Sequence, residues 1–231
     1  MRSSFILCML LSACAVGGSA DDTTPEDSGV VKDSGVPPKD ASSQDASAQD
    51  SSAQDVAAFD APIQETGNGC AFSGVLATYD FTGELGNQVS TPAKSTAPNV
   101  TAVAISRASV LTATAGADSL NSSNWATAAN VNTNKYVTFS VAPTGSCTLD
   151  ITQVSIATKS SGTGPTKVAL ATSVDAFAAM TTLTPNATST PSLSITGATS
   201  AVEIRVYGWA ASGAGGTMRV DTTLTVSGST N

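Results

Sequence analysis

Hydrophobic and polar residues alternate through most of residues 69–231, which is the pattern of β-strands that bury one face. Four sets of apolar residues recur at even spacing: Val75, Ala77, Tyr79 and Phe81; Val137, Phe139 and Val141; Val202, Ile204 and Val206; and Met218, Val220, Leu224 and Val226. Polar residues such as Glu203 and Arg205 occupy the positions between them. Each set predicts a strand with one core-facing and one solvent-facing side.

One stretch departs from this alternation. Leu149 and Ile151 are odd-numbered, whereas the apolar residues that follow are even-numbered, at Val154 and Ile156. A strand exchanges its two faces when one residue is inserted. The shift therefore predicts a β-bulge or a strand break near Thr152 and Gln153.

Segments rich in Gly, Pro and Ser separate the predicted strands at residues 142–145, 161–165 and 212–216. Residues 175–180 form the one segment that predicts a helical turn. Many short strands joined by frequent turns are typical of an antiparallel β-sandwich. We therefore expect one all-β domain over residues 69–231, long enough to bury a core of its own.

Residues 14–68 have a different composition, dominated by Asp, Ser, Ala, Gly, Pro and Gln, and Asp recurs every five residues from Asp40 to Asp60. A period of five fits neither a helix nor a strand. Eleven acids and two bases give this segment a net charge of −9, whereas seven acids and seven bases leave residues 69–231 neutral. We expect a disordered, self-repelling tether that spans about 40 Å, because so few large apolar residues cannot offset the entropy of ordering.

The segment before the tether has the layout of a secretory signal, in which Arg2 is followed by an apolar run at residues 5–11. This run is too short to span a bilayer, and we expect no transmembrane helix. The Leu-Ser-Ala-Cys sequence that ends at Cys14 resembles the lipobox of bacterial lipoproteins. The resemblance implies that residues 1–13 are removed and that lipidated Cys14 anchors the chain in the membrane of the bacterial cell envelope. Ala15 fits the outer membrane under the Gram-negative sorting rule for lipoproteins.

The chain contains no histidine and four cysteines. The lack of histidine excludes Ser-His-Asp catalysis, Cys-His catalysis and histidine zinc sites. Cys8 lies in the predicted signal, which leaves Cys70 and Cys147 in the predicted domain. In an oxidising envelope we expect these two to form a disulfide.

The charged residues of 69–231 are few and dispersed. We expect no nucleic-acid binding, because the basic residues do not cluster. A glycoside hydrolase needs two carboxylates that face each other across a cleft, and no such pair is visible in the sequence. We therefore predict that the protein is not an enzyme, and keep the hydrolase as the least favoured alternative.

Four motifs carry a resemblance that covers residues 74–228: Tyr79-Asp80-Phe81, Gly164-Pro165-Thr166, Tyr207-Gly208-Trp209 and Arg219-Val220-Asp221. Together they resemble a jelly-roll module of secreted and cell-surface bacterial proteins, similar in build to carbohydrate-binding and galactose-binding-like domains. The resemblance implies a jelly-roll β-sandwich. Members usually continue from the final Asp with Asn, where this chain has Thr222.

Sugars stack on exposed aromatic rings and bond to neighbouring amides. The candidate residues for such a site are Trp209 with Tyr207, and Trp125 with Asn121 and Asn124. Tyr207 is out of phase with the apolar residues of its strand, so we expect it to face away from their core. Core packing is the alternative for each tryptophan, since large aromatic side chains are usually buried.

Asp80 and Asp221 are candidate ligands of a structural calcium ion, because similar modules pair their first and last strands and often brace this region with calcium. Ca²⁺ takes six or more oxygen ligands, however. The favoured alternative is two solvated acids, or Asp221 paired with Arg219 or Arg205. No other cofactor is expected.

These patterns predict a cell-envelope lipoprotein that presents a non-catalytic β-sandwich binding module. The candidate ligand is a glycan, and an envelope protein is the other candidate partner. The alternative is a structural or adhesive surface lipoprotein without a small ligand.

Overall fold

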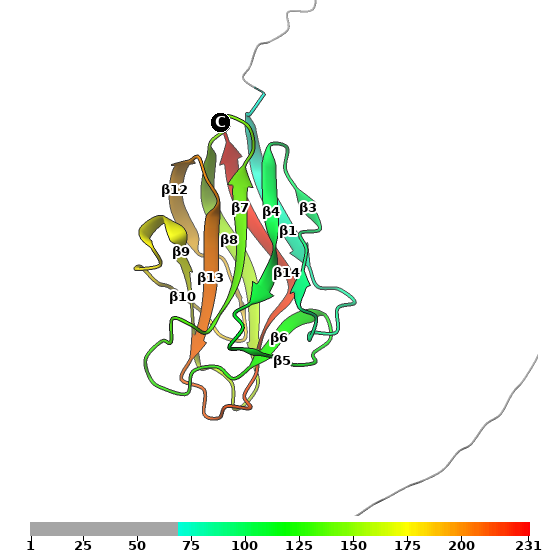
Figure 1. Cartoon of the computed structure of the whole chain (residues 1–231), viewed down its shortest axis with the longest axis vertical. Helices are drawn as coiled ribbons and strands as arrows, with labels where there is room; N and C mark the ends of the chain where they lie inside the picture. The colour runs from blue at the N-terminus through cyan, green and yellow to red at the C-terminus, as the bar shows by residue number, and fades with distance from the viewer. Residues whose placement is uncertain (1–68) are drawn as a thin grey trace, which may run out of the picture. The chain divides into compact units, whose positions relative to one another are not determined.

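The computed structural model describes residues 69–231, which form two antiparallel sheets packed as a sandwich (Figure 1). In the eight-stranded sheet, the order β11-β8-β14-β1-β3 is extended by β12 beside β8, by β6 beside β14 and by β5 beside β6. The strands of this sheet are β1 (Phe72–Asp80), β3 (Ser95–Thr96), β5 (Thr112–Ala113), β6 (Ser119–Ser123), β8 (Leu149–Ser160), β11 (Thr188–Ser189), β12 (Ser192–Ala198) and β14 (Met218–Thr230).

The six-stranded sheet has the order β10-β9-β13-β7-β4-β2. Its strands are β2 (Ser90–Thr91), β4 (Val100–Arg107), β7 (Tyr136–Pro143), β9 (Lys167–Thr172), β10 (Thr181–Leu183) and β13 (Val202–Trp209). The two sheets confirm the expected all-β sandwich. Within residues 69–231, no helix is long and apolar enough to cross a membrane. The predicted signal, Cys14 and the tether lie outside the described residues.

The first and last strands lie side by side, as the resemblance implied. β1 pairs antiparallel with β14, from Phe72 opposite Thr230 to Asp80 opposite Thr223. Both strands also contribute to the core between the sheets, where Tyr79 and Leu224 are completely buried. The pairing closes the sandwich with the two ends of the domain.

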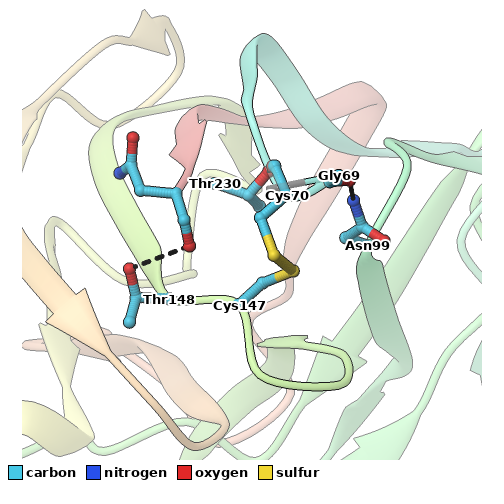
Figure 2. The surroundings of a disulfide bond; sticks show 7 residues. Gly69, Cys70, Asn99, Cys147, Thr148 and Thr230 are labelled. Carbon is cyan, nitrogen blue, oxygen red and sulfur yellow. Dashed lines mark hydrogen bonds between the residues drawn. A yellow bond between two sulfur atoms is a disulfide. The ribbon is translucent and has the colours of Figure 1, made fainter. Parts of the chain in front are cut away.

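Figure 2 shows the end of the sandwich where the described chain begins. A disulfide joins Cys70 to Cys147, with their Cα atoms 5.4 Å apart, so the predicted pairing is confirmed. The Thr230 hydroxyl donates a hydrogen bond to the Cys70 carbonyl, and the Asn99 amide donates one to the carbonyl of Gly69. These contacts tie the entry of the domain to the last strand and to the turn after β7. In the chain-entropy model, closing so long a loop adds roughly 4 kcal/mol of stability.

A bulge near the start of β1 overturns one predicted position. Val75 is 47% exposed, whereas Leu76 is fully buried. The register with β14 shifts between Val75 and Ala77, so Leu76 is an extra residue that points into the core. The prediction that Val75 shares the buried face was wrong because the bulge reverses the alternation at this point.

The predicted bulge in β8 is confirmed. Ser227 and Gly228 are consecutive on β14, but their partners on β8 are Gln153 and Ile151. Thr152 is therefore the extra residue, as the change of phase indicated.

β14 carries a second irregularity that alternation did not reveal. Between Asp221 and Leu224 it advances three residues while β8 advances one, so Thr222 and Thr223 are extra. Two extra residues leave the phase unchanged. Thr222 has φ 54°, a left-handed conformation that Asn adopts more readily than a β-branched residue. Thr222 therefore holds a backbone conformation that is less favourable for threonine than for asparagine.

Within residues 69–231, the one helical element lies slightly before its predicted position. Residues 175–180 were expected to form a helical turn, but the 3₁₀ turn η1 spans Ser173–Asp175. Ala176 and Phe177 have φ values of 56° and 63°, which end the turn and direct the chain back toward β10. The ring of Phe177 thereby reaches the outer side of β13, where it contacts Arg205.

Candidate functional site

The outer face of the six-stranded sheet carries a group of charged and aromatic side chains centred on β13. Val202, Ile204 and Val206 fill the core, so Glu203 and Arg205 face outward between them. The strand register places residues of β7 beside them, with Ser140 opposite Glu203 and Thr138 opposite Arg205. We call Tyr136, Thr138, Phe177, Glu203 and Arg205 the Arg205 cluster.

Arg205 is held on three sides. Its Nε donates a hydrogen bond to Glu203 Oε1 at 2.7 Å. Its guanidinium carbon lies 4.2 Å from the ring centroid of Tyr136 and 3.8 Å from that of Phe177. Cations are attracted to aromatic faces at such distances. The guanidinium is therefore fixed between two rings, and its side chain is 23% exposed.

Glu203 is positioned by its neighbours as well. The Thr138 hydroxyl donates a hydrogen bond to Glu203 Oε1 at 2.9 Å. Burial alone would raise the pKa of Glu203, but the hydrogen bonds from Arg205 and Thr138 outweigh it and hold the pKa below its ordinary value. Glu203 thus presents a charged carboxylate at neutral pH. Its side chain is 35% exposed.

A hollow of about 320 Å³ adjoins the cluster, and Thr138 and Glu203 of the cluster line it. Its polar walls come from β4, β7, η1 and β13: Ser106, Thr138, Ser140, Ser173 and Glu203. Val103 supplies an apolar side and is largely exposed. The hollow therefore combines hydroxyl groups, one carboxylate and one apolar surface.

A bulge in β4 shapes this hollow. The register between β4 and β7 shifts between Val103 and Ser106. The Val103 carbonyl then accepts a hydrogen bond from the hydroxyl of core residue Tyr79 at 2.7 Å. Burial raises the pKa of Tyr79, so the donor keeps its proton. The exposed rim at Val103 is thereby anchored from inside the sandwich.

The sequence predicted two ligand-binding residues on this strand, Tyr207 and Trp209. Tyr207 lies on the outer side of β13 as expected, but it is 1% exposed. Tyr136 packs edge-on against it, with ring centroids 5.8 Å apart. The prediction that Tyr207 offers a contact surface was therefore wrong, because side chains beside it on the sheet cover it. Trp209 ends β13 opposite Lys167 and is partly exposed.

The second predicted group does not form one surface. Trp125 is a core residue, so the alternative of core packing holds for it. A Cβ atom built on Gly208 would lie 3.1 Å from the Trp125 ring, which shows how closely the two pack. Asn121 is 5% exposed. Asn124 is exposed, and its amide donates to the Val110 carbonyl at 2.8 Å.

The predicted calcium ligands have other partners. The Asp80 carboxylate accepts hydrogen bonds from Lys94 and Thr82, which lower its pKa well below the ordinary value. Asp221 Oδ1 lies 3.6 Å from Arg219 Nε. Within residues 69–231, no group of three or more His, Cys, Asp or Glu could hold a metal ion. Asp221 is thus paired with Arg219, one of the two predicted partners, whereas the other, Arg205, pairs with Glu203. The pairing of Asp80 with Lys94 was not predicted.

The hollows give no acid pair of the kind that a glycoside hydrolase uses. Five hollows on residues 69–231 contain at most one acidic residue each. Glu203 is the acid of the hollow described above, and Arg205 and Thr138 hold it in the charged form. The geometry fits hydrogen bonding to a ligand better than proton transfer to one.

Sequence reasoning missed Arg205, Tyr136 and Phe177. The polar position of Arg205 on a predicted strand was visible, but the rings that hold it come from β7 and from the turn after η1. An arginine and a glutamate two residues apart on an alternating strand were the one available signal.

Comparison with known proteins finds no matching family model and no matching curated protein. Among solved structures, the carbohydrate-binding module CBM36, in complex with calcium and xylotriose, is 21% identical. The match covers 54% of this chain and 100% of that chain, with a TM-score of 0.31. At this level of similarity, neither a ligand nor a site residue is transferred to this chain.

Proposed function

We propose that residues 69–231 are a non-catalytic glycan-binding module, and that the Arg205 cluster with its adjoining hollow is the contact surface. The observation that carries this proposal is the joint presence, on one face, of an ordered Arg–Glu pair and several serine and threonine hydroxyls. Sugar hydroxyls both donate and accept hydrogen bonds. A carboxylate, a guanidinium and hydroxyl groups can satisfy both roles.

The cluster is also organised before a ligand arrives. Arg205 lies between Tyr136 and Phe177, and the Glu203 carboxylate is bonded to two partners. Side chains that are already ordered lose little further freedom on binding. This smaller loss of conformational entropy matters for short glycans, because they make few contacts and bind weakly.

Presentation from the cell envelope is the second part of the proposal. It rests on the Leu-Ser-Ala-Cys sequence at Cys14 and on the acidic composition of residues 14–68. We expect the native protein to partition into detergent, and Cys14→Ser to release it from the membrane or block processing. A wild-type protein that is found soluble, with residues 1–13 still attached, contradicts this part.

The glycan-binding part is tested by screening the full chain on a glycan array and measuring each positive glycan by calorimetry. We expect Glu203→Gln and Arg205→Gln each to weaken binding at least about tenfold, which is the scale of one charge-assisted hydrogen bond. Ser155→Ala is the matched control, because Ser155 lies on β8 in the other sheet. Binding that is unchanged in both cluster variants rules out this surface.

One observation favours the adhesive alternative as a second candidate. Leu85 and Val89 are among the most exposed large apolar residues described, at 71% and 85%. Arg107 fixes the loop between them by donating to the carbonyls of Gly86 and Gln88. A fixed loop with apolar tips suits contact with a protein partner. Loss of cell-surface adhesion in a Leu85→Ser/Val89→Ser variant, with glycan binding unchanged, favours this function.

A further inference from the structure

A second hollow is lined by residues of β6, β8 and β14 and of the segments that adjoin β8 and β14. Figure 1 shows these three strands. The volume of the hollow is about 180 Å³, and it is lined by Asn121, Lys159, Ser160, Ser161, Thr217 and Arg219. Three of these residues form a row across neighbouring strands: Arg219 of β14 pairs with Asn121 of β6 on one side and with Lys159 of β8 on the other. We call this the Lys159 hollow.

Two side chains of this row carry a buried polar atom that has no hydrogen-bond partner among residues 69–231: Asn121 Oδ1 and Arg219 Nε. Asn121 is almost fully buried, with an exposed fraction of 5%. Its amide nitrogen is already bonded to the Ala115 carbonyl at 2.8 Å. A buried polar atom without a partner costs about 1–3 kcal/mol, so two on neighbouring strands call for an explanation.

The charges at the hollow are unbalanced toward the positive. Lys159 and Arg219 are both on its wall, and Lys159 is exposed. The acid nearest to Arg219 is Asp221, whose Oδ1 lies 3.6 Å from Nε, too far for a hydrogen bond. An anion that enters the hollow therefore meets two cations, Lys159 and Arg219, and Arg219 is only loosely paired with the carboxylate of Asp221.

We propose that the Lys159 hollow binds a carboxylate-bearing sugar unit, such as a uronic acid. The sugar carboxylate accepts hydrogen bonds from Arg219 and Lys159, while a ring hydroxyl donates to Asn121 Oδ1. A simple anion satisfies the cations but leaves Asn121 Oδ1 without a donor. A neutral sugar donates a hydrogen bond to Asn121 Oδ1 but brings no negative charge to the two cations. An acidic sugar matches the whole set, and this site is separate from the Arg205 cluster on the other sheet.

The test is a calorimetric or NMR titration of the full chain with methyl glucuronide, methyl glucoside, acetate and sulfate. We expect methyl glucuronide to bind at least about tenfold more tightly than the other three, because it alone offers both a carboxylate and hydroxyls. Equal binding of acetate or sulfate overturns the sugar part of the proposal. Equal binding of methyl glucoside overturns the role of the cations.

Variants locate the site. Lys159→Met keeps the aliphatic stem and removes the charge, and we expect it to weaken methyl glucuronide binding at least about tenfold. Lys167→Met is the matched control, because Lys167 is an exposed lysine of β9 in the other sheet. Unchanged binding in Lys159→Met overturns the proposal. Neutral glycans identified on the array report on the Arg205 cluster, whereas methyl glucuronide reports on the Lys159 hollow, so failure at one site is told apart from failure at the other.

Discussion

β13 and β14 each carry an arginine and an acid two residues apart on the outer face of their sheet, yet the two pairs differ in geometry. On β13, Arg205 Nε is 2.7 Å from the carboxylate of Glu203. On β14, Arg219 Nε is 3.6 Å from that of Asp221. The first is a hydrogen-bonded ion pair, and the second leaves Nε without a hydrogen bond.

The neighbouring strands and turns account for the difference. Tyr136 and Phe177 hold Arg205 from both sides, and Thr138 fixes the carboxylate beside it. Asn121 and Lys159 flank Arg219 instead, and neither offers it an aromatic face. The same local spacing thus gives an ordered pair in one sheet and an unsatisfied arginine in the other.

Removing each arginine breaks this comparison most directly. We expect Arg205→Ala to lower the free energy of unfolding by about 2 kcal/mol, since it loses a charged hydrogen bond and two cation–π contacts. Arg219→Ala is the matched variant, and we expect a loss of less than about 0.5 kcal/mol. Urea unfolding at neutral pH measures both. Equal losses would show that the rings around Arg205 add nothing.

The backbone beside Asp221 offers the next test. Thr222 is in the left-handed region, which costs a β-branched residue about 1 kcal/mol or more. Thr222→Asn should therefore raise the free energy of unfolding by about 1 kcal/mol. Thr225→Asn, farther along the same strand, is the control and should bring no gain, because Asn is disfavoured in extended strands. Thermal unfolding of the two variants checks the difference in sign.

Alternation predicted the faces of β13 and the bulge at Thr152, because a single inserted residue changes the phase of a strand. It could not predict Thr222 and Thr223, since two inserted residues leave the phase unchanged. The outward direction of Tyr207 was predictable, but its burial was not, because Tyr136 arrives from another strand.

The candidate site was harder to predict than the fold for the same reason. Asn121 was predicted to bind a ligand together with Trp125, but Trp125 lies in the core. Its partners at the Lys159 hollow, Arg219 and Lys159, are brought beside it by strand register. No local pattern encodes which strands become neighbours. A site that is assembled across three strands is therefore visible only after folding.

Arg219→Met should stabilise the protein, whereas removing Arg205 should destabilise it. Methionine fills a similar volume without a buried Nε that lacks a hydrogen bond, so we expect a gain of about 0.5 kcal/mol in the free energy of unfolding. The same variant should lose methyl glucuronide binding. A gain in stability together with a loss of binding is expected of a residue kept for a ligand. A destabilisation as large as that of Arg205→Ala contradicts this account.

The smallest expected effect is the pH dependence that Glu203 confers. The pKa of Glu203 in the folded protein lies below its ordinary value of 4.5, because Arg205 and Thr138 bond the charged form. A depressed folded pKa stabilises the fold above the unfolded pKa, and this contribution is lost as pH falls through the folded value. Wild type should therefore exceed Glu203→Gln in stability at pH 6, and the gap should narrow below about pH 4. Asp80, whose pKa is also depressed, is present in both chains, so their difference isolates Glu203. In an Arg205→Ala background the gap should shrink at every pH, and a gap of unchanged size would mean that Arg205 does not hold the carboxylate.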